Sequence, residues 1–532
     1  MEMNKEVKRV GLLTGAKNLS WLWLLIAVLV FFSHVRGIGP FIVDDSFITF
    51  RYARNLSQGY GFVYNPGGPP TEGFTSPLWM VTLTLPYLLH LSPELSARYL
   101  GIFFILLTLG LSYLIMRKLL PEAIRESQPW LPGGMVLALA AMPATAVHAI
   151  SGMETALYTF LITFYFYRLI IYLKQPSRRE ALFLALSGFL VGLTRPEGNL
   201  IPFLSIGMAF FFLSKKDNIE LMKMVFVGYV LPGVIYFTAR YAYFGLMFPL
   251  PYYVKLGNMY LFAGRLFMIL YLSDFFLTGG FMAVFSANKL TKQLIPLWVA
   301  VIGFVLFFFF PMHVMGYEGR FIYPAMPMLY CLVYLGCLSF TEGLIAQSKL
   351  LSHPQAARIF GISVAMVPII LLMLAYPKIQ HNKIEEYQGM LNAHIQLGKD
   401  LRGFPCDNPR QMHVAMGDAG AVPYFSDWNT LDIIGLNNKE MAINKNDESK
   451  AEAILKTNPD LLILVSNSYK KFSSPVQIDN AVYRHMIKDS NYKLARIYQF
   501  QKDYHYLWVM PKKETPLYHY FFDSPGEKPF LN

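Results

Sequence analysis

Two adjacent carboxylates, Asp44 and Asp45, directly follow the first long apolar segment of the chain. Neighbouring carboxylates repel each other, which raises the pKa of one of them and suits it to act as a general base. An aspartate before Ser46-Phe47 is also a good cap for a helix and complements the helix dipole. Capping explains one aspartate more easily than two, and on these residues alone both interpretations stay open.

Further charged residues fall in loops on the same predicted side of the membrane as this pair. Charge near a bilayer is costly and tends to be paired or functional. Acidic and basic groups on one face suit a reaction between a negatively charged lipid substrate and a hydroxyl acceptor. The candidate substrate-binding residues are Arg51, Arg54, Glu72, Arg98, Glu154, Arg195, Glu197, Lys255 and Arg320.

The acidic candidates each have a structural alternative. Glu154 stands at a predicted helix start, where a glutamate is an ordinary partner of the helix dipole. Glu72 precedes a glycine in a loop rich in turn formers, where a solvated position is equally expected. Glu197 belongs to Arg195-Pro196-Glu197-Gly198, which joins two spans with almost no loop, and a local Arg–Glu ion pair is its alternative role.

The basic candidates suit a phosphate. A lysine is a point charge that fits one phosphate oxygen, and an arginine can hold two oxygens at once. Lys255 follows a Pro- and aromatic-rich segment, Phe248 to Tyr253, and its alternative role is snorkelling to the membrane interface. Arg320 has the same two interpretations.

Composition indicates lipid as the main solvent of this chain. Its 532 residues are 54% hydrophobic and only 15% charged, where an average soluble domain carries roughly 25% charged residues. The mean hydropathy is +0.37. The net charge of +12 comes from short basic runs between apolar stretches, as the positive-inside rule predicts, so nucleic acid is excluded as a partner.

Apolar stretches predict about eleven transmembrane helices, because a span needs roughly 20 mostly apolar residues. The predicted spans lie near residues 19–36, 98–116, 131–149, 155–173, 181–194, 199–213, 225–244, 266–286, 294–312, 321–340 and 357–376. Basic residues are dense in alternate loops, which places the N-terminus in the cytoplasm. The alternation requires that residues 77–91, which are too few for a comfortable crossing, lie flat at the outer surface.

The first outer loop, residues 37–97, is predicted to contain a short amphipathic helix at the membrane interface. Ile48, Tyr52 and Leu56 recur every four residues and form one apolar face, while Arg51 and Arg54 fall on the other side.

Residues 1–376 are therefore predicted to form the transmembrane catalytic domain, and residues 377–532 a soluble α/β domain outside the cytoplasm. Met412–Met416 and Leu461–Val465 read as buried strands, Ala451–Lys456 as part of a helix and Asn491–Met510 as a strand pair.

No metal site can be assigned from spacing. The three cysteines lack metal-ligand spacing. His34, His148 and His313 each lie near an outer helix end and are interpreted as interfacial residues. In the soluble domain, Asp418 and Asp432 either contact sugar or serve as turn residues, with the turn slightly favoured.

The first-loop residues resemble those of the terminal arabinofuranosyltransferases of actinobacterial cell walls, which belong to the GT-C superfamily of polyprenyl-phosphate-dependent glycosyltransferases. The resemblance rests on a specific first-loop pattern and on weaker pieces in the expected order along most of the chain. These are residues 44–56, Gly59-Tyr60-Gly61, Asn65-Pro66-Gly67, Glu72 to Trp79, Ser151 to Thr155, Arg195 to Gly198, Pro249 to Lys255, Arg320 with Pro324 and Pro327, Gly417 to Ala421 and Leu431 to Leu436.

This resemblance implies an inverting transfer of sugar from a polyprenyl-phosphate donor to a hydroxyl of a cell-envelope glycan. Asp44 or Asp45 would deprotonate the acceptor, and Arg98, Arg195, Lys255 and Arg320 would neutralise the lipid phosphate. Some superfamily members bind a divalent metal, so a metal held by Asp44 and Asp45 stays an alternative to metal-free base catalysis.

Two other classes of function compete with the enzyme. A transporter or flippase of lipid-linked sugars would carry internal repeats and a midplane site, whereas no clear repeat is present and the charges lie at one side. A non-catalytic envelope assembly protein would depend on the soluble domain rather than on Asp44 and Asp45. The sugar, the acceptor and the oligomeric state stay open.

Overall fold

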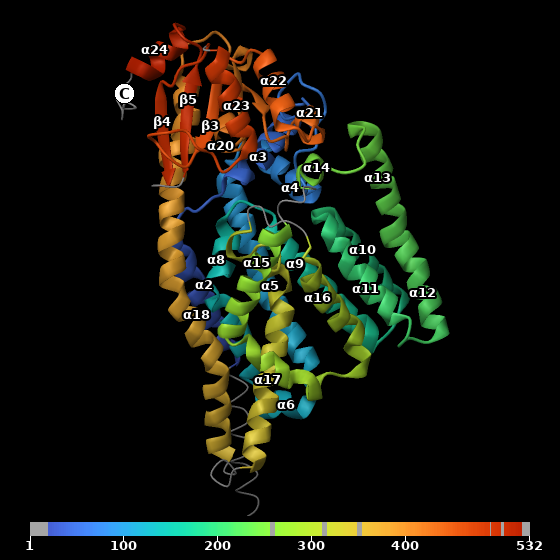
Figure 1. Ribbon diagram of the computed structural model, residues 1–532. Coiled ribbons are helices and arrows are strands. Elements are labelled where there is room, and N and C mark those ends of the chain that lie inside the picture. The colour runs from blue at the N-terminus through green and yellow to red at the C-terminus, as the bar shows by residue number, and fades with distance from the viewer. Residues whose placement is uncertain are drawn as a thin grey trace, which may run out of the picture.

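The computed structural model describes residues 20–255, 261–310, 316–347, 354–489, 491–501 and 505–523. A helical bundle carries a sheet domain at one end (Figure 1). The basic N-terminal segment and His313 lie outside the described residues. The helices of the bundle and of the first outer loop are α2 (Ser20–Ile38), α3 (Asp44–Ser57), α4 (Pro77–Leu88), α5 (Pro93–Leu119), α6 (Glu122–Ser127), α7 (Leu131–Ala141), α8 (Pro143–Ile150), α9 (Thr155–Lys174), α10 (Arg178–Thr194), η1 (Pro196–Asn199), α11 (Leu200–Ala209), α12 (Lys215–Val225), η2 (Phe226–Val230), α13 (Leu231–Phe244), α14 (Leu250–Lys255), α15 (Leu261–Leu277), η4 (Gly280–Lys289), η5 (Lys292–Leu294), α16 (Ile295–Phe307), η6 (Tyr317–Gly319), η7 (Tyr323–Ala325), α17 (Met326–Gln347) and α18 (Pro354–Met390).

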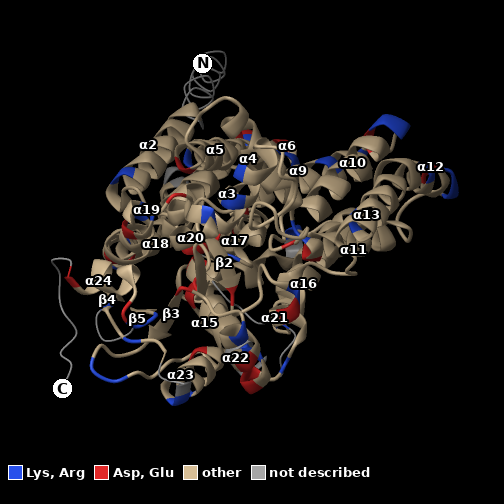
Figure 2. Ribbon diagram, turned by 90° about the horizontal axis from the view of Figure 1, so that it is seen from above, with Lys and Arg blue, Asp and Glu red and all other residues tan. Residues whose placement is uncertain are grey.

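Six helical stretches among the described residues are long and apolar enough to cross a membrane, and two bent pairs raise this to eight. The bent pairs are α7 with α8, at 62°, and α15 with η4, at 77°. Charged residues lie mostly at helix ends and in the sheet domain, while the bundle helices are mostly uncharged along their lengths (Figure 2). The chain is a multi-pass membrane protein.

The predicted count of eleven spans is not confirmed. Within the described residues the predicted spans are helical, but two of them, 131–149 and 266–286, are the bent pairs. In addition, α10 has 17 residues, α11 has 10 and α16 has 13. A straight crossing of about 30 Å needs roughly 20 residues, so these three helices are short for it.

Helix α3 has the predicted position but not the predicted surroundings. It begins after Val43, whose backbone is extended, and Asp44 and Asp45 fill its first turn, where carboxylates favour the helix dipole. The expectation that Arg51 and Arg54 form a polar face at the membrane interface was wrong. The C-terminal domain covers that face and supplies backbone carbonyls to both arginines.

Helix α18 is 37 residues long and connects the two parts of the molecule. It runs from the far end of the bundle up to the sheet domain (Figure 1), and the predicted boundary between residues 376 and 377 falls inside it. It is followed at once by a five-residue π-helix, η9 (Leu391–Ile395), and by α19 (Gln396–Gly403). The two parts are therefore joined by continuous helix rather than by a linker.

The C-terminal domain is the predicted α/β unit. Its five-stranded sheet has the order β2-β1-β3-β5-β4, with β1 parallel to β2 and β3, and β5 antiparallel to β3 and β4. The remaining elements are η10 (Pro409–Gln411), β1 (His413–Met416), α20 (Ala421–Ser426), β2 (Asn429–Asp432), α21 (Lys439–Ile443), α22 (Asp447–Lys456), β3 (Leu461–Ser466), α23 (Gln477–Asp489), β4 (Arg496–Gln501), β5 (His505–Pro511) and α24 (Pro516–Asp523).

The central strand β3 is buried on both faces, which explains its unbroken apolar sequence. Alternate side chains of a strand point to opposite faces. Leu461 and Ile463 pack with α19, α20 and α24, whereas Leu462 and Leu464 pack with α22 and α23. The sheet thus has helices on both sides and one edge directed toward the first outer loop.

Candidate active site

The first turn of α3 is partly exposed, as is the end of the helix, whereas its middle is buried. Asp44 and Asp45 are partly exposed, whereas the side chains from Ser46 to Ala53 are buried. Helices α3, α4 and α14 lie at the end of the bundle that carries the sheet domain, and α6 lies at the opposite end (Figure 1). The two aspartates therefore lie where the membrane part meets the C-terminal domain.

The turn between α8 and α9 is fastened to the start of α3. The Val43 N–H donates to the Ser151 carbonyl at 3.2 Å, and the Trp79 indole N–H donates to the Gly152 carbonyl at 3.0 Å. Gly152 has φ of +82°, and a Cβ there would press on Ser46, so a glycine is required. This packing brings Glu154, at the end of the turn, close to Asp45.

Glu154 is the centre of a buried ion network. Its Oε1 accepts from Arg320 at 2.7 Å and also from Arg195, and Arg195 donates through Nε to Glu197 at 2.6 Å. Burial opposes ionisation of Glu154, but the two guanidinium groups outweigh it and lower its pKa to about 2. The local Arg195–Glu197 pair is thus present, and it is one part of a larger cluster.

Asp45 and Lys255 belong to the same neighbourhood. Burial raises the pKa of Asp45, the cations of Arg320 and Lys255 oppose this, and Asp418 and Glu154 add to it. Burial lowers the pKa of Lys255 to about 8, although Asp45 favours its charged form. Among the described residues Lys255 has no ion-pair partner, which leaves its ammonium group available to an anion.

Asp44 is directed toward the C-terminal domain instead. Its Oδ1 accepts from the Ala421 N–H at 2.8 Å, and a Cβ at Gly420 would overlap its carboxylate. Burial raises the pKa of Asp44 to about 7, with Asp418 and Asp45 raising it further and His394 opposing them. The two adjacent aspartates therefore occupy different environments, one beside the cations and one against the sheet domain.

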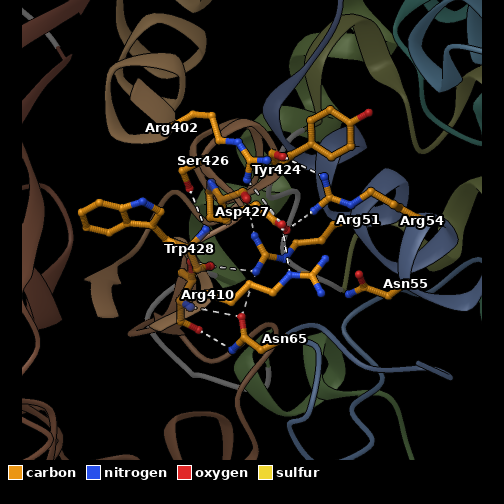
Figure 3. A network of polar contacts seen from close by, with 12 residues as sticks. Arg51, Arg54, Asn55, Asn65, Arg402, Arg410, Tyr424, Ser426, Asp427 and Trp428 are labelled. Carbon is orange, nitrogen blue, oxygen red and sulfur yellow. Dashed lines mark hydrogen bonds and ion pairs between the residues drawn. The ribbon is translucent and has the colours of Figure 1, made fainter. Parts of the chain in front are cut away.

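Arg51 and Arg54 lie outside this cluster and hold the first loop to the C-terminal domain. Arg51 is fully buried and donates to the Tyr64 carbonyl at 2.8 Å and to the Trp428 carbonyl at 2.9 Å. Arg54 pairs with Asp427 at 2.9 Å. Figure 3 shows how these contacts converge around Asp427, with Arg402 and Arg410 on its other oxygen.

Glu72 and Arg98 also lie apart from the cluster. Glu72 is buried and receives both Nε and Nη2 of Arg240, on α13, at 3.0 and 2.5 Å. This bidentate pair joins the first loop to α13. Arg98 is partly exposed near the start of α5, within electrostatic range of Tyr387 on α18.

Two of the three predicted interfacial histidines, His34 and His148, are buried and contact other protein groups. His34 stacks on Tyr376, with ring centroids 3.9 Å apart, and His148 Nε2 lies 3.1 Å from the Glu318 carbonyl oxygen. Neither belongs to a group of possible metal ligands. Among the described residues that group consists of His394, Asp418 and His505, and it includes neither Asp44 nor Asp45.

The two aspartates weighed in the C-terminal domain have different roles. Asp432 is fully buried and accepts from the backbone N–H groups of Ile434, Gly435 and Asn437, so it is the turn residue. Asp418 instead faces two imidazoles. Sequence reasoning missed both rings, and it missed Arg240, because no local spacing links these residues to their partners.

Part of the chain is similar in sequence to a curated membrane glycosyltransferase. It is 29% identical to a terminal beta-(1->2)-arabinofuranosyltransferase of Mycobacterium tuberculosis over 238 residues, 43% of this chain. That alignment spans 37% of the relative's length. Residues 384–519 match a family described as a domain of unknown function, DUF8728.

Solved structures share the fold over nearly the whole chain. ArnT from Cupriavidus metallidurans bound to undecaprenyl phosphate superimposes with a TM-score of 0.55 and 13% identity, covering 92% of this chain and 98% of ArnT. The oligosaccharyltransferase AglB from Archaeoglobus fulgidus, in complex with an inhibitory peptide and a dolichol-phosphate, gives 0.55 at 11% identity over 94% and 77%. The chain therefore has the fold of the GT-C glycosyltransferases and resembles the terminal arabinofuranosyltransferases among them.

Proposed function

We propose that this protein is an inverting glycosyltransferase that takes a sugar from a polyprenyl-phosphate donor. The acceptor is a hydroxyl of a cell-envelope glycan or glycoconjugate, on the outer face of the cytoplasmic membrane. The observation that carries the proposal is the electrostatic interaction of Asp45 with Lys255 and Arg320 between membrane bundle and soluble domain, where Asp45 and Lys255 are partly exposed and Arg320 is buried.

Asp45 is the proposed general base. The acceptor oxygen forms a bond to the anomeric carbon while the bond from that carbon to the phosphate oxygen breaks, and the acceptor proton passes to Asp45. Burial raises its pKa above the ordinary aspartate value, which makes it a stronger proton acceptor. Asp44 is the weaker candidate because its carboxylate already accepts from Ala421.

Lys255 and Arg320 are proposed to bind the phosphate, which becomes the leaving group. Their charges would stabilise the negative charge that develops on its oxygen. Lys255 has no other ion pair among the described residues, and Glu154 holds Arg320 and Arg195 in place. Glu197 would act through Arg195, as a positioning residue.

A cavity next to Arg320 suits the lipid chain of such a donor. Its lining is mostly apolar and includes Tyr271, Phe275, Ile322, Met326 and Leu372. Glu318 and Gly319, which precede Arg320 in the sequence, also line it, whereas Arg320 does not.

Comparative glycan analysis tests the proposal. A strain lacking the gene is expected to lose one sugar residue from its envelope glycan, identified by mass spectrometry, and the wild-type gene restores it. Asp45→Asn is expected to leave the sugar missing at normal protein abundance. Glu122→Gln, on α6 at the other end of the bundle, is the matched acidic control and restores it. An unchanged glycan in the Asp45→Asn strain would exclude Asp45 as the base.

A further inference from the structure

A second cluster of reactive side chains lies beside Asp44 but outside the proposed active site. His394 belongs to η9, Asp418 follows β1, and His505 begins β5. His394 Nε2 and His505 Nε2 lie 3.0 and 2.9 Å from the same oxygen, Oδ2 of Asp418. One ligand atom from each side chain lies within 4.8 Å of the other two.

We propose that His394, Asp418 and His505 bind one zinc ion. Two imidazole nitrogens and one carboxylate oxygen form a ligand set that zinc accepts, whereas magnesium and calcium prefer oxygen ligands alone. Three protein ligands leave the fourth position of a tetrahedral ion open to water or to another group. The inference concerns metal binding only and does not depend on sugar transfer.

The backbone conformation and the burial of His394 both support a metal-binding site. The π-helix that carries it is a rare conformation that occurs often at functional sites. The His394 side chain is 2% exposed, and its ring packs against Phe500 with centroids 5.0 Å apart. Asp418 and His505 are partly exposed, which gives an ion a route of entry.

The loop that carries Asp418 is held from both sides. The Tyr64 hydroxyl, from the first outer loop, donates to the Ala419 carbonyl at 2.6 Å. Gly420 packs against Asp44, where a side chain would collide. A metal at this point would connect η9, the turn after β1 and the start of β5. It would stabilise the part of the C-terminal domain that contacts the first turn of α3.

Metal analysis of the full-length chain tests the proposal. The protein is purified in detergent, loaded with zinc, dialysed against metal-free buffer and measured by inductively coupled plasma mass spectrometry. We expect one zinc per chain in the wild type and background zinc in Asp418→Asn and His505→Gln. His519→Gln is the control, because His519 is an exposed histidine of the same domain, and it retains the zinc.

Cobalt replacement separates loss of metal from loss of fold. Wild-type protein loaded with Co²⁺ is expected to show the visible absorption bands of a tetrahedral site, and His505→Gln to lack them. Thermal unfolding of each variant without metal checks that the domain is folded. Background zinc in the wild type, or full zinc in Asp418→Asn and His505→Gln, would overturn the proposal. Since the readout is metal content, failure here leaves the proposed sugar transfer untouched, and the reverse also holds.

Discussion

At the residue scale, two aspartates that are adjacent in sequence have different surroundings. Asp45 lies beside Lys255 and Arg320, and Asp44 lies against the backbone of the C-terminal domain. Asp45→Asn is expected to lower kcat by about 10²–10⁴-fold, which is the usual contribution of a general base. Asp44→Asn keeps a hydrogen-bonding side chain at Ala421 and is expected to lose less. Steady-state kinetics with purified protein measure both, and a larger loss in Asp44→Asn would assign the base to the other carboxylate.

Lys255 gives the reaction a pH dependence. Its pKa is lowered to about 8 by burial, against the opposing charge of Asp45 and with Arg195 and Arg320 adding to the shift. The ammonium group is charged below that pH and neutral above it, so kcat/KM is expected to fall as the pH rises through about 8. Lys255→Arg keeps the charge to higher pH and should remove this alkaline limb, even where its absolute rate is lower. An alkaline limb unchanged in Lys255→Arg would exclude Lys255 as its origin.

Asp45 is expected to determine how kcat/KM depends on pH on the acid side. Because burial raises its pKa, the base is protonated at a pH where an ordinary aspartate would be ionised. Activity is therefore lost as the pH falls through this raised pKa. We expect kcat/KM to fall on the acid side at a pH above the normal aspartate range near 4, as a pH profile would measure. A profile that stays flat down to pH 4 would contradict this role.

At the element scale, the first outer loop is fastened by buried pairs whose removal should cost stability. Glu72→Ala leaves the Arg240 guanidinium buried without its partner, and breaking such a pair costs about 3–5 kcal/mol. The thermal unfolding temperature in detergent should be clearly lower for Glu72→Ala than for the wild type. It should be unchanged for Glu122→Ala, whose side chain is 80% exposed. Equal unfolding temperatures in the two variants would show that the Glu72–Arg240 pair does not hold the loop.

The elements show how far the sequence alone can be interpreted. The position of α3 and the strands β1 and β3 follow from apolar spacing and were predicted. The surroundings of α3 were not, because Arg51 and Arg54 bind carbonyls about 370 residues further along the chain. The spacing of apolar residues within a segment carries no information about such a distant contact. The cluster of His394, Asp418 and His505 was missed for the same reason, since it forms only when η9, the turn after β1 and the start of β5 come together.

The same limit applies to the candidate-site residues. Glu154, Arg195, Lys255 and Arg320 were selected because they fall in loops on the same predicted side of the membrane, and the structure brings them together. Glu72 was selected by the same reasoning, yet its partner is Arg240. Sequence position identifies which charges lie near the membrane surface, but only packing decides which of them face each other.

At the scale of the whole molecule, the proposed function requires that Asp45, Lys255 and Arg320 lie on the same side of the membrane as the C-terminal domain. In a background where Cys406, the partly exposed native cysteine, is replaced by serine, single cysteines at positions 255 and 445 should react with an impermeant maleimide added outside the cell. A cysteine at position 125, in α6, should react only after permeabilisation. Labelling of positions 255 and 125 from the same side would contradict the topology.

The most direct measurement follows a labelled polyprenyl-phosphate sugar in proteoliposomes that contain the purified protein and isolated envelope glycan. The account predicts that the label becomes covalently attached to the glycan with inverted anomeric configuration, and that Asp45→Asn abolishes this attachment. Label that crosses the bilayer without entering the glycan, or that is attached equally by Asp45→Asn, would contradict the central claim.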